Sequence, residues 1–269
     1  MQPELNGKPV SMFCPIAAGA GDVLTLGMAV QGLRGYLAVQ GGIQVPVVMG
    51  SRSTNLKCGI GGLEGRALRD GDVLATASGG LNFADSVSGN RLERKKEISR
   101  RAARARQLLI GPEGEYLRRP SNPYRIMNQE RVVMVRAVPG PQSEAFTESG
   151  KRVFERNFYR LTADSNRMAC KLTGAAVETA AGSDMISDGI VEGSVQIASD
   201  GMPIVMLADH QTTGGYAKIG TVISTDIPAL AQLKPGEQIA FKFVTPKEAV
   251  AVCRREARKL AWIKKYLEG

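Results

Sequence analysis

The sequence predicts a mainly β fold with a few helices, in the α+β class, and three observations carry this prediction. Glycine is abundant, with 31 of 269 residues, and it stands at turn-like positions between short apolar runs. Aromatic and helix-periodic stretches are few. A pattern of turn, glycine or acid, and apolar strand recurs at 17–26, 67–74 and 233–239, which indicates one barrel-like architecture used at least twice.

The clearest hairpin lies late in the chain. Two apolar runs, Ser194–Ala198 and Pro203–Ala208, flank Asp200-Gly201, and Asp-Gly supplies the positive φ that a tight turn needs. A third apolar run follows at Ile219–Ile223. These runs predict three strands of one sheet, with a polar segment between the second and the third.

That polar segment, Asp209–Thr213, is followed by Gly214 and Gly215, then Tyr216 and Lys218. A carboxylate, an amide, hydroxyls and unhindered backbone amides at a strand end suit a small polar ligand. The same residue types also form ordinary polar turns that cap a barrel, so both interpretations stay open.

The N-terminal part, residues 1–80, is expected to be the remainder of a β subdomain. Asn6-Gly7 is a hairpin-turn signal, and strands are predicted at Arg34–Val39 and Val45–Met49. Ser51 and Arg52 follow the second of these strands. They either hold a carboxylate or phosphate through charge-assisted hydrogen bonds or form an exposed loop.

Residues 81–130 are predicted to be an insertion with a basic helix at 91–110 and a proline-rich linker. Lysine and arginine gather among the alanines of this helix. A basic helix can bind nucleic acid, but no aromatic interleaving or helix-turn-helix pattern accompanies it. A solvated surface helix is the simpler interpretation, so we expect no nucleic-acid partner.

Residues 131–245 are predicted to form a C-terminal β-barrel, and residues 246–269 a terminal helix. A helix is expected at Ser143–Phe158 and a polar turn at Asp164–Met168. Arg167 in that turn is expected to pair with a substrate carboxylate, with Asp164 or with Asp184. Thr245 and Glu248 form a capping box that starts the last helix.

Composition limits the remaining possibilities. The formal net charge is +9, much of it in the basic helix, so charge alone says little about partners. The four cysteines form no Cys-x-x-Cys pair, and no apolar run has the length that spans a bilayer. The single histidine argues against a multi-histidine metal site. We therefore expect a cytoplasmic protein with reduced thiols and no metal.

Several of these segments together resemble one known group, the biotin-dependent carboxyltransferase-like family. This family includes the C component of 5-oxoprolinase, allophanate hydrolase subunit 2, the Kip antagonist and part of the carboxyltransferase domain of urea carboxylase. The segments occur in the family's order: Tyr36–Val39 with Gly41-Gly42, Gly50–Thr54, Gly61–Arg66, Pro139–Gln142, Asp164–Met168 and Ala208–Tyr216.

The resemblance implies a cyclophilin-like barrel and a sister protein of related fold, the B component, with an A component as the third member of a complex. It implies that the complex opens the lactam of 5-oxoproline to glutamate with ATP hydrolysis. The alternative is a carboxyltransferase that moves a carboxyl group from biotin, on a separate carrier, to urea or a similar amide. A second alternative is a regulatory partner of the B component without chemistry of its own.

This chain departs from the family pattern in two places. Relatives carry an N-terminal segment before the position matching Leu5–Gly7, so the first β subdomain is expected to be N-terminally truncated. The basic insertion replaces a short loop. ATP is expected to bind mainly outside this chain, because the Gly-rich turn lacks the Walker A spacing.

Matching the family motifs residue by residue gives a candidate site. Asp209, Gln211 and Lys218 are the candidate catalytic residues, with Asp209 as the acceptor or base for a substrate N–H. The candidate substrate-binding residues are Ser51, Arg52, Arg167, Gln196, Thr212, Thr213, Gly214, Gly215 and Tyr216. The resemblance implies a small amide or lactam as the substrate.

Overall fold

The structure is a computed structural model of the chain, and it describes residues 1–77, 124–127, 130–180, 182 and 184–268. The predicted basic helix at 91–110, and most of the predicted insertion at 81–130, lie outside these residues. Among the helices of the described part, none has the length and apolar character needed to cross a membrane.

The chain divides into two compact units, and each is described by itself. The first unit contains residues 1–14, 20–34 and 101–269, and the second contains residues 15–19 and 35–100. The predicted domain boundaries at 80, 130 and 245 stay a prediction.

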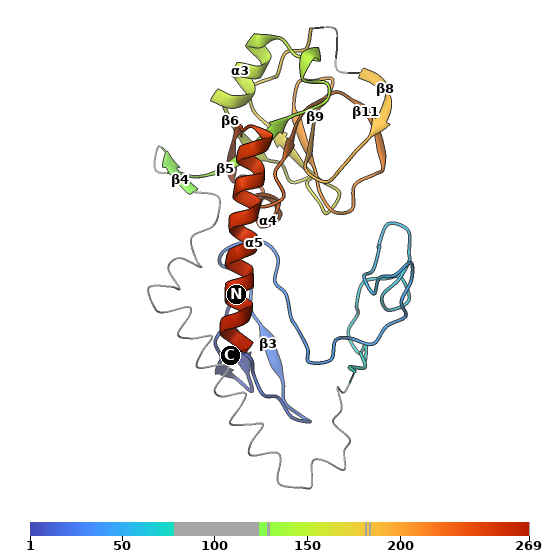
Figure 1. Cartoon of the computed structure of the whole chain (residues 1–269). Coiled ribbons are helices and arrows are strands. Elements are labelled where there is room, and N and C mark those ends of the chain that lie inside the picture. The colour runs from blue at the N-terminus through green and yellow to red at the C-terminus, as the bar shows by residue number, and fades with distance from the viewer. Residues whose placement is uncertain (78–123, 128–129, 181, 183, 269) are drawn as a thin grey trace. The chain divides into compact units, whose positions relative to one another are not determined.

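Seven strands of the first unit close into a barrel, and an eighth strand extends one of them (Figure 1). The order around the barrel is β12-β9-β10-β7-β6-β13-β5, and β12 also pairs with β5. Only β13 and β5 run parallel among these pairs. The strands are β5 (Glu130–Pro139), β6 (Phe158–Leu161), β7 (Ala169–Thr173), β9 (Ser194–Ile197), β10 (Pro203–Met206), β12 (Lys218–Val222), β13 (Gln238–Phe243) and the extension β4 (Tyr124–Met127). The predicted mainly β barrel is confirmed, as are its three strands around the polar segment.

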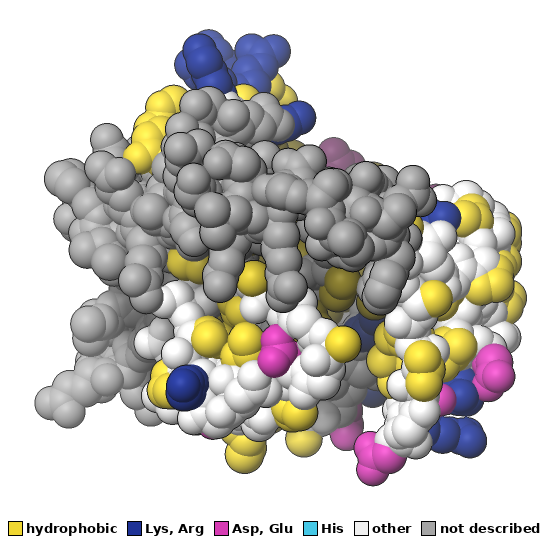
Figure 2. Space-filling model, turned by 90° about the horizontal axis from the view of Figure 1, so that it is seen from below, with side chains coloured by type: hydrophobic (Ala, Val, Ile, Leu, Met, Phe, Trp, Pro, Cys, Tyr) yellow, Lys and Arg dark blue, Asp and Glu magenta, His cyan; other side chains and the backbone are white. Residues whose placement is uncertain are grey.

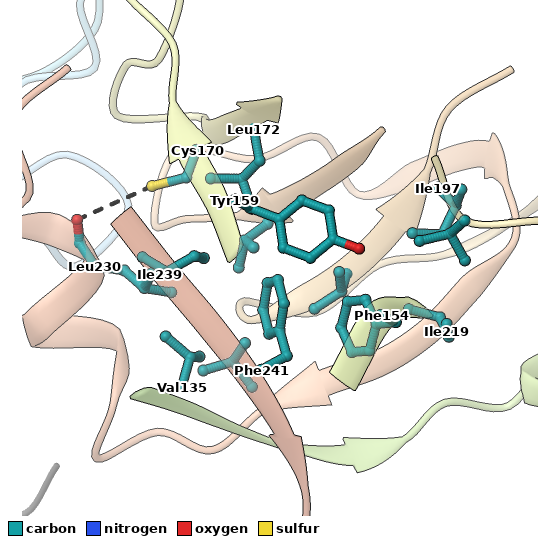
Figure 3. Close-up of a cluster of buried hydrophobic side chains, with 14 of the residues drawn as sticks. Val135, Phe154, Tyr159, Cys170, Leu172, Ile197, Ile219, Leu230, Ile239 and Phe241 are labelled. Carbon is teal, nitrogen blue, oxygen red and sulfur yellow. Dashed lines mark hydrogen bonds between the residues drawn. The ribbon is translucent and has the colours of Figure 1, made fainter. Parts of the chain in front are cut away.

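A cluster of aromatic side chains fills the centre of the barrel. Phe154 stacks on Phe241 with ring centroids 4.2 Å apart, and Tyr159 meets Phe241 edge-on at 5.8 Å. All three side chains are buried, and Figure 3 shows them among aliphatic residues from several strands. Phe154 comes from helix α3 (Glu148–Arg156), so this helix supplies part of the barrel core.

Tyr159 buries a polar group without a partner. Its hydroxyl is fully enclosed and has no hydrogen-bond partner among the residues that the structure describes, and burial raises the pKa of Tyr159. Tyr159→Phe removes this hydroxyl, so we expect the free energy of unfolding to rise by about 1 kcal/mol. Urea unfolding of the purified chain measures the change. Tyr36→Phe, at an 86% exposed tyrosine, is the control; a clear loss of stability in Tyr159→Phe alone would contradict the expectation.

Helices α3 and α5 begin at side-chain caps. Thr147 Oγ1 accepts a hydrogen bond from the Gly150 amide at the start of α3 (2.9 Å). The capping box at Thr245 and Glu248 is present, with the Thr245 amide donating to Glu248 (2.7 Å), and α5 runs from Pro246 to Glu268. The predicted helix at Ser143–Phe158 is shorter than expected, because a 3-10 turn, η2 (Ser143–Ala145), precedes α3. A further short helix, α4, covers Ile227–Ala231.

A two-stranded ribbon stands beside the barrel (Figure 1). It consists of β8 (Asp184–Gly189) and β11 (Thr213–Tyr216), paired antiparallel with Gly214 opposite Asp188. Ile190, which follows β8, packs in a small apolar cluster with Ala169 and Met206 of the barrel strands. Met185 of β8 packs against the main core, so the ribbon and the residue that follows it contact both clusters.

The N-terminal residues of the first unit form a small sheet in the order β2-β1-β3, with β1 at Pro3–Leu5, β2 at Lys8–Pro9 and β3 at Leu24–Leu26. Asn6 and Gly7 both have positive φ, 53° and 71°, which is the geometry of a type I′ hairpin turn. The predicted turn at Asn6-Gly7 is confirmed.

The second unit lacks the strands predicted for it. Neither Arg34–Val39 nor Val45–Met49 forms a ladder. In the part of this unit that the structure describes, only isolated bridges occur, such as Ile43 with Thr76 and Val48 with Ser51. Tyr36 and Met49 are 86% and 95% exposed. Strand propensity is realised by packing against neighbours, and these apolar side chains have no core to pack on within the described residues. Figure 2 likewise shows hydrophobic side chains on the surface of the face it draws.

Candidate functional site

The candidate site lies on the outer side of the barrel wall, under the β8–β11 ribbon. Gln196 of β9 and Lys218 of β12 are direct cross-strand partners. Gln196 alternates with Val195 and Ile197, which belong to the barrel core, so its side chain points away from that core. Both polar side chains are nevertheless buried, with 2% and 3% of their surface exposed.

The Lys218 ammonium is held by the end of β8. Nζ lies 2.6 Å from Asp188 Oδ2 and 3.0 Å from the Gly189 carbonyl oxygen. An ammonium has three N–H donors, and within the described residues the third one has no acceptor. One N–H of Lys218 is therefore available to an acceptor outside the described residues.

Asp188 forms the exposed side of this ion pair, since about half of its side chain (49%) remains accessible. The hydrogen bond from Lys218, together with those from the Gly189 amide and the Gln142 side chain, lowers the pKa of Asp188. The carboxylate is thus ionised at neutral pH and forms an ion pair with the Lys218 ammonium.

The ribbon strand β11 approaches the buried pair closely, and this explains its glycine. A Cβ on Gly214 would lie 2.8 Å from Gln196 Nε2 and 2.5 Å from Ile190 Cδ1, so a side chain there would displace the ends of these two side chains. Gln196 Nε2 also donates to the Tyr216 carbonyl oxygen (3.2 Å). Gln196, Gly214, Tyr216 and Lys218, all predicted site residues, are therefore brought together.

Two residues of this site received no role from the sequence. Gln142 Nε2 donates to Asp188 Oδ2 (3.0 Å), and Gln142 Oε1 accepts from the Lys218 backbone amide (3.3 Å). Gln142 ends the Pro139–Gln142 segment, and Asp188 precedes the hairpin at Ser194–Ala208. Both residues therefore lie in or near segments that the sequence singles out. Their contacts depend on the fold. Asp188 is 46 residues from Gln142 and 30 residues from Lys218 in sequence, and only the folded chain brings the three together.

Asp209 and Arg167 form a second polar pair at the end of β10. Arg167 Nε lies 2.9 Å from Asp209 Oδ2, and Arg167 Nη2 lies 3.2 Å from Oδ1. The partner of Arg167 is thus Asp209, and neither Asp164 nor Asp184, which the sequence suggested. The pair is open to solvent, with 57% and 33% of the two side chains exposed.

The remaining residues of the polar segment connect these two pairs through the backbone. The Thr212 carbonyl oxygen accepts from the Ile190 amide (2.9 Å), and Thr213 stands opposite Gly189 in the ribbon. Gln211 is exposed, and its carbonyl oxygen lies 2.6 Å from His210 Nδ1. Gly215 has room for a Cβ, whose nearest atom would be the Met185 carbonyl oxygen at 3.5 Å.

Ser51 and Arg52 belong to the second unit. Ser51 closes a tight turn with Val48, in which Met49 and Gly50 have φ of 50° and 77°. Ser51 Oγ accepts a hydrogen bond from the Ser53 amide (3.0 Å), and both Ser51 and Arg52 are exposed. Their role in binding a substrate stays a prediction.

Comparison with known proteins identifies the family. The profile of the carboxyltransferase domain, subdomains A and B, matches residues 1–243. The C component of the 5-oxoprolinase of Escherichia coli (strain K12) is 37% identical over 246 residues, which is 90% of this chain and 67% of that protein. That of Haemophilus influenzae is 34% identical over 264 residues, covering 98% of this chain and 73% of that protein.

More distant relatives share the fold. Urea amidolyase of Lachancea kluyveri is 28% identical over 250 residues, covering 88% of this chain and 12% of that protein. The crystal structure of the Kluyveromyces lactis urea carboxylase superposes with a TM-score of 0.74 at 22% identity, over 98% of this chain and 22% of that one. The resemblance inferred from the sequence motifs is confirmed. The chain belongs to the family of the carboxyltransferase domain, subdomains A and B.

Proposed function

We propose that this chain is the C-like component of an ATP-dependent 5-oxoprolinase complex, which hydrolyses 5-oxoproline to glutamate. The similarity to the C components of two 5-oxoprolinases supports this proposal. The structural observation that carries it is the buried Lys218 ammonium, which is fixed by Asp188 and has one N–H without an acceptor in the described part of the chain.

Opening a lactam places negative charge on the carbonyl oxygen when the carbonyl carbon is attacked. A pre-organised cation with a free N–H stabilises such an oxygen, and burial strengthens this interaction. Lys218 supplies the cation, and the backbone amides near Gly214 and Gly215 are candidate further donors. Water adds to the carbonyl carbon, and the C–N bond then breaks. Asp209, as the candidate base, would hold the substrate N–H, accept a proton from the attacking water and return it to the leaving ring nitrogen, with Arg167 fixing its carboxylate.

Asp209→Asn tests the base role directly. It keeps the shape of the side chain but removes its charge and basicity, so we expect turnover of 5-oxoproline to fall by about 10²- to 10⁴-fold. The rate of glutamate formation by the assembled complex measures the effect. Asp164→Asn, an exposed acid on the neighbouring turn, is the matched control and should stay near the wild-type rate. Turnover of Asp209→Asn within about threefold of wild type would remove the base from the mechanism.

ATP has no evident place at this site. The free N–H of Lys218 can satisfy one oxygen, whereas a triphosphate needs a cradle of several donors. We therefore assign no step of ATP chemistry to the described residues, and the proposal places the nucleotide on the other components of the complex. A cytoplasmic location is part of the proposal and fits the four cysteines, which form no disulfide.

The similarity to urea amidolyase favours a second candidate function. In that case the same site would bind urea or a similar amide as the acceptor of a carboxyl group, and biotin would arrive on a separate carrier protein. A fixed ammonium serves both reactions, because both polarise the oxygen of an N–C=O group. A third candidate, a regulatory partner of a B-like component, needs no functional Lys218 at all.

Reconstitution separates the three candidates. The chain is co-purified with its B-like and A-like partner proteins, and glutamate formation from 5-oxoproline and ATP is measured with each component omitted in turn. We expect glutamate only when all three are present. A stable complex that is inactive on 5-oxoproline but carboxylates urea with a biotin carrier would support the second candidate. Full activity without this chain would contradict the proposal.

A further inference from the structure

Strand β12 has an irregularity at the residue that carries the ammonium. Lys218 pairs with Gln196 and Gly220 pairs with Val195, so Ile219 is an extra residue in the ladder between β12 and β9. A β-bulge of this kind re-aims a side chain and takes a backbone group out of regular pairing. Here it lies between the buried Lys218 and Gly220, and its extra residue Ile219 belongs to the core.

Gln142 satisfies the backbone group at this bulge. Its Oε1 accepts the hydrogen bond from the Lys218 amide (3.3 Å), while its Nε2 donates to the carboxylate that holds the Lys218 side chain (3.0 Å). Only one orientation of the side-chain amide serves both partners, because a flipped amide would turn its oxygen toward the Asp188 carboxylate. A single planar group thus contacts both the backbone and the counter-ion of Lys218.

The turn that carries Gln142 is fixed against the same strand. The Gly140 amide donates to the Ile219 carbonyl oxygen (2.9 Å), and the Ser143 amide donates to the Gly140 carbonyl oxygen (3.1 Å). A Cβ on Gly140 would lie only 2.3 Å from the Lys218 carbonyl oxygen. The turn therefore has little freedom to move, and it holds Gln142 next to Lys218.

We infer that Gln142 is a positioning residue, which locks the bulge at Lys218 to the Asp188 carboxylate so that the ammonium keeps one N–H directed to a substrate oxygen. Its effect on turnover rests on the proposed function, whereas its effect on the Lys218 backbone does not. The two effects are therefore measured separately.

Amide hydrogen exchange in the full chain, followed by NMR, measures the effect on the backbone. In Gln142→Ala the Lys218 amide loses its acceptor, so its exchange should be roughly tenfold faster than in wild type. Gln142→Glu keeps an oxygen at the same position, and its Lys218 amide should exchange near the wild-type rate. Ser143→Ala on the same turn is the control. Unchanged exchange in Gln142→Ala would overturn the inference.

A double-mutant cycle measures the effect on turnover. Gln142→Ala should lower kcat/KM of the assembled complex by about 10- to 100-fold, because the ammonium is misplaced. Gln142→Glu should lose at least as much, since its carboxylate repels Asp188. In an Asp188→Asn background Gln142→Ala should add little, because Gln142 acts through Asp188. A general loss of stability would instead add to the Asp188→Asn effect, and that additivity would overturn the inference.

The outcomes distinguish the two proposals. If the wild-type complex does not turn over 5-oxoproline, the proposed function fails, and the exchange of the Lys218 amide still decides whether Gln142 positions it. If the complex is active and Gln142→Ala leaves the exchange of the Lys218 amide unchanged, or adds fully to the effect of Asp188→Asn, the positioning role fails while the proposed function stands.

Discussion

Replacing Lys218 by methionine is expected to lower kcat/KM of the assembled complex for 5-oxoproline by about 10²- to 10³-fold. Methionine fills a similar volume but removes the cation that would stabilise the substrate oxygen. The fold should tolerate the change, because the Asp188 carboxylate that loses its partner is 49% exposed and stays solvated. Asp188 would still accept hydrogen bonds from Gln142 and the Gly189 amide.

Lys171→Met is the matched control for this prediction. Lys171 lies on β7 of the same barrel with its side chain exposed, so its loss should leave kcat/KM near the wild-type value. Thermal unfolding of both variants separates chemistry from stability. An active Lys218→Met complex with a strongly lowered melting temperature would contradict the catalytic role, since Lys218 would then be a structural ion-pair partner only.

Phe154→Ala is expected to be the most destabilising of the substitutions considered, by about 3–5 kcal/mol. The Phe154 ring is fully buried, stacks on Phe241 and contacts the rings of Tyr159 and Phe243. Its removal leaves a cavity where α3 meets the barrel core (Figure 3), and closed strands cannot collapse to fill it. Urea unfolding of the purified chain gives the change in the free energy of unfolding.

Phe13→Ala makes the same substitution at a phenylalanine that is 77% exposed. An exposed side chain loses no packing, so the change should stay within about 0.5 kcal/mol of wild type. Equal effects of the two substitutions would show that the aromatic cluster does not stabilise the barrel.

Local sequence signals predicted the C-terminal elements because the chemistry that fixes them is local. The Asp200-Gly201 turn, the capping box at Thr245 and the apolar runs of β9, β10 and β12 each specify a structure within a few residues. The strands predicted at Arg34–Val39 and Val45–Met49 failed for the opposite reason. Strand formation there needs neighbouring strands and a core, and a run of apolar residues contains neither.

The sequence predicted several residues of the site, but it did not predict which of them contact one another. Lys218, Gln196 and Gly214 were named from their segments, and the barrel brings them together. Asp188 and Gln142 were overlooked as functional residues, because their partners are distant in sequence and depend on barrel closure and on the bulge at Lys218. Arg167 was assigned the wrong acidic partners, since Asp209 is 42 residues away in sequence.

The most direct test of the central claim is a crystal structure of the assembled complex with bound 5-oxoproline. We expect the lactam carbonyl or the carboxylate oxygen of the substrate within about 3 Å of Lys218 Nζ, on the side of the ammonium that Asp188 and Gly189 leave free. Substrate bound elsewhere, with Lys218 contacting only Asp188 and Gly189, would contradict the claim.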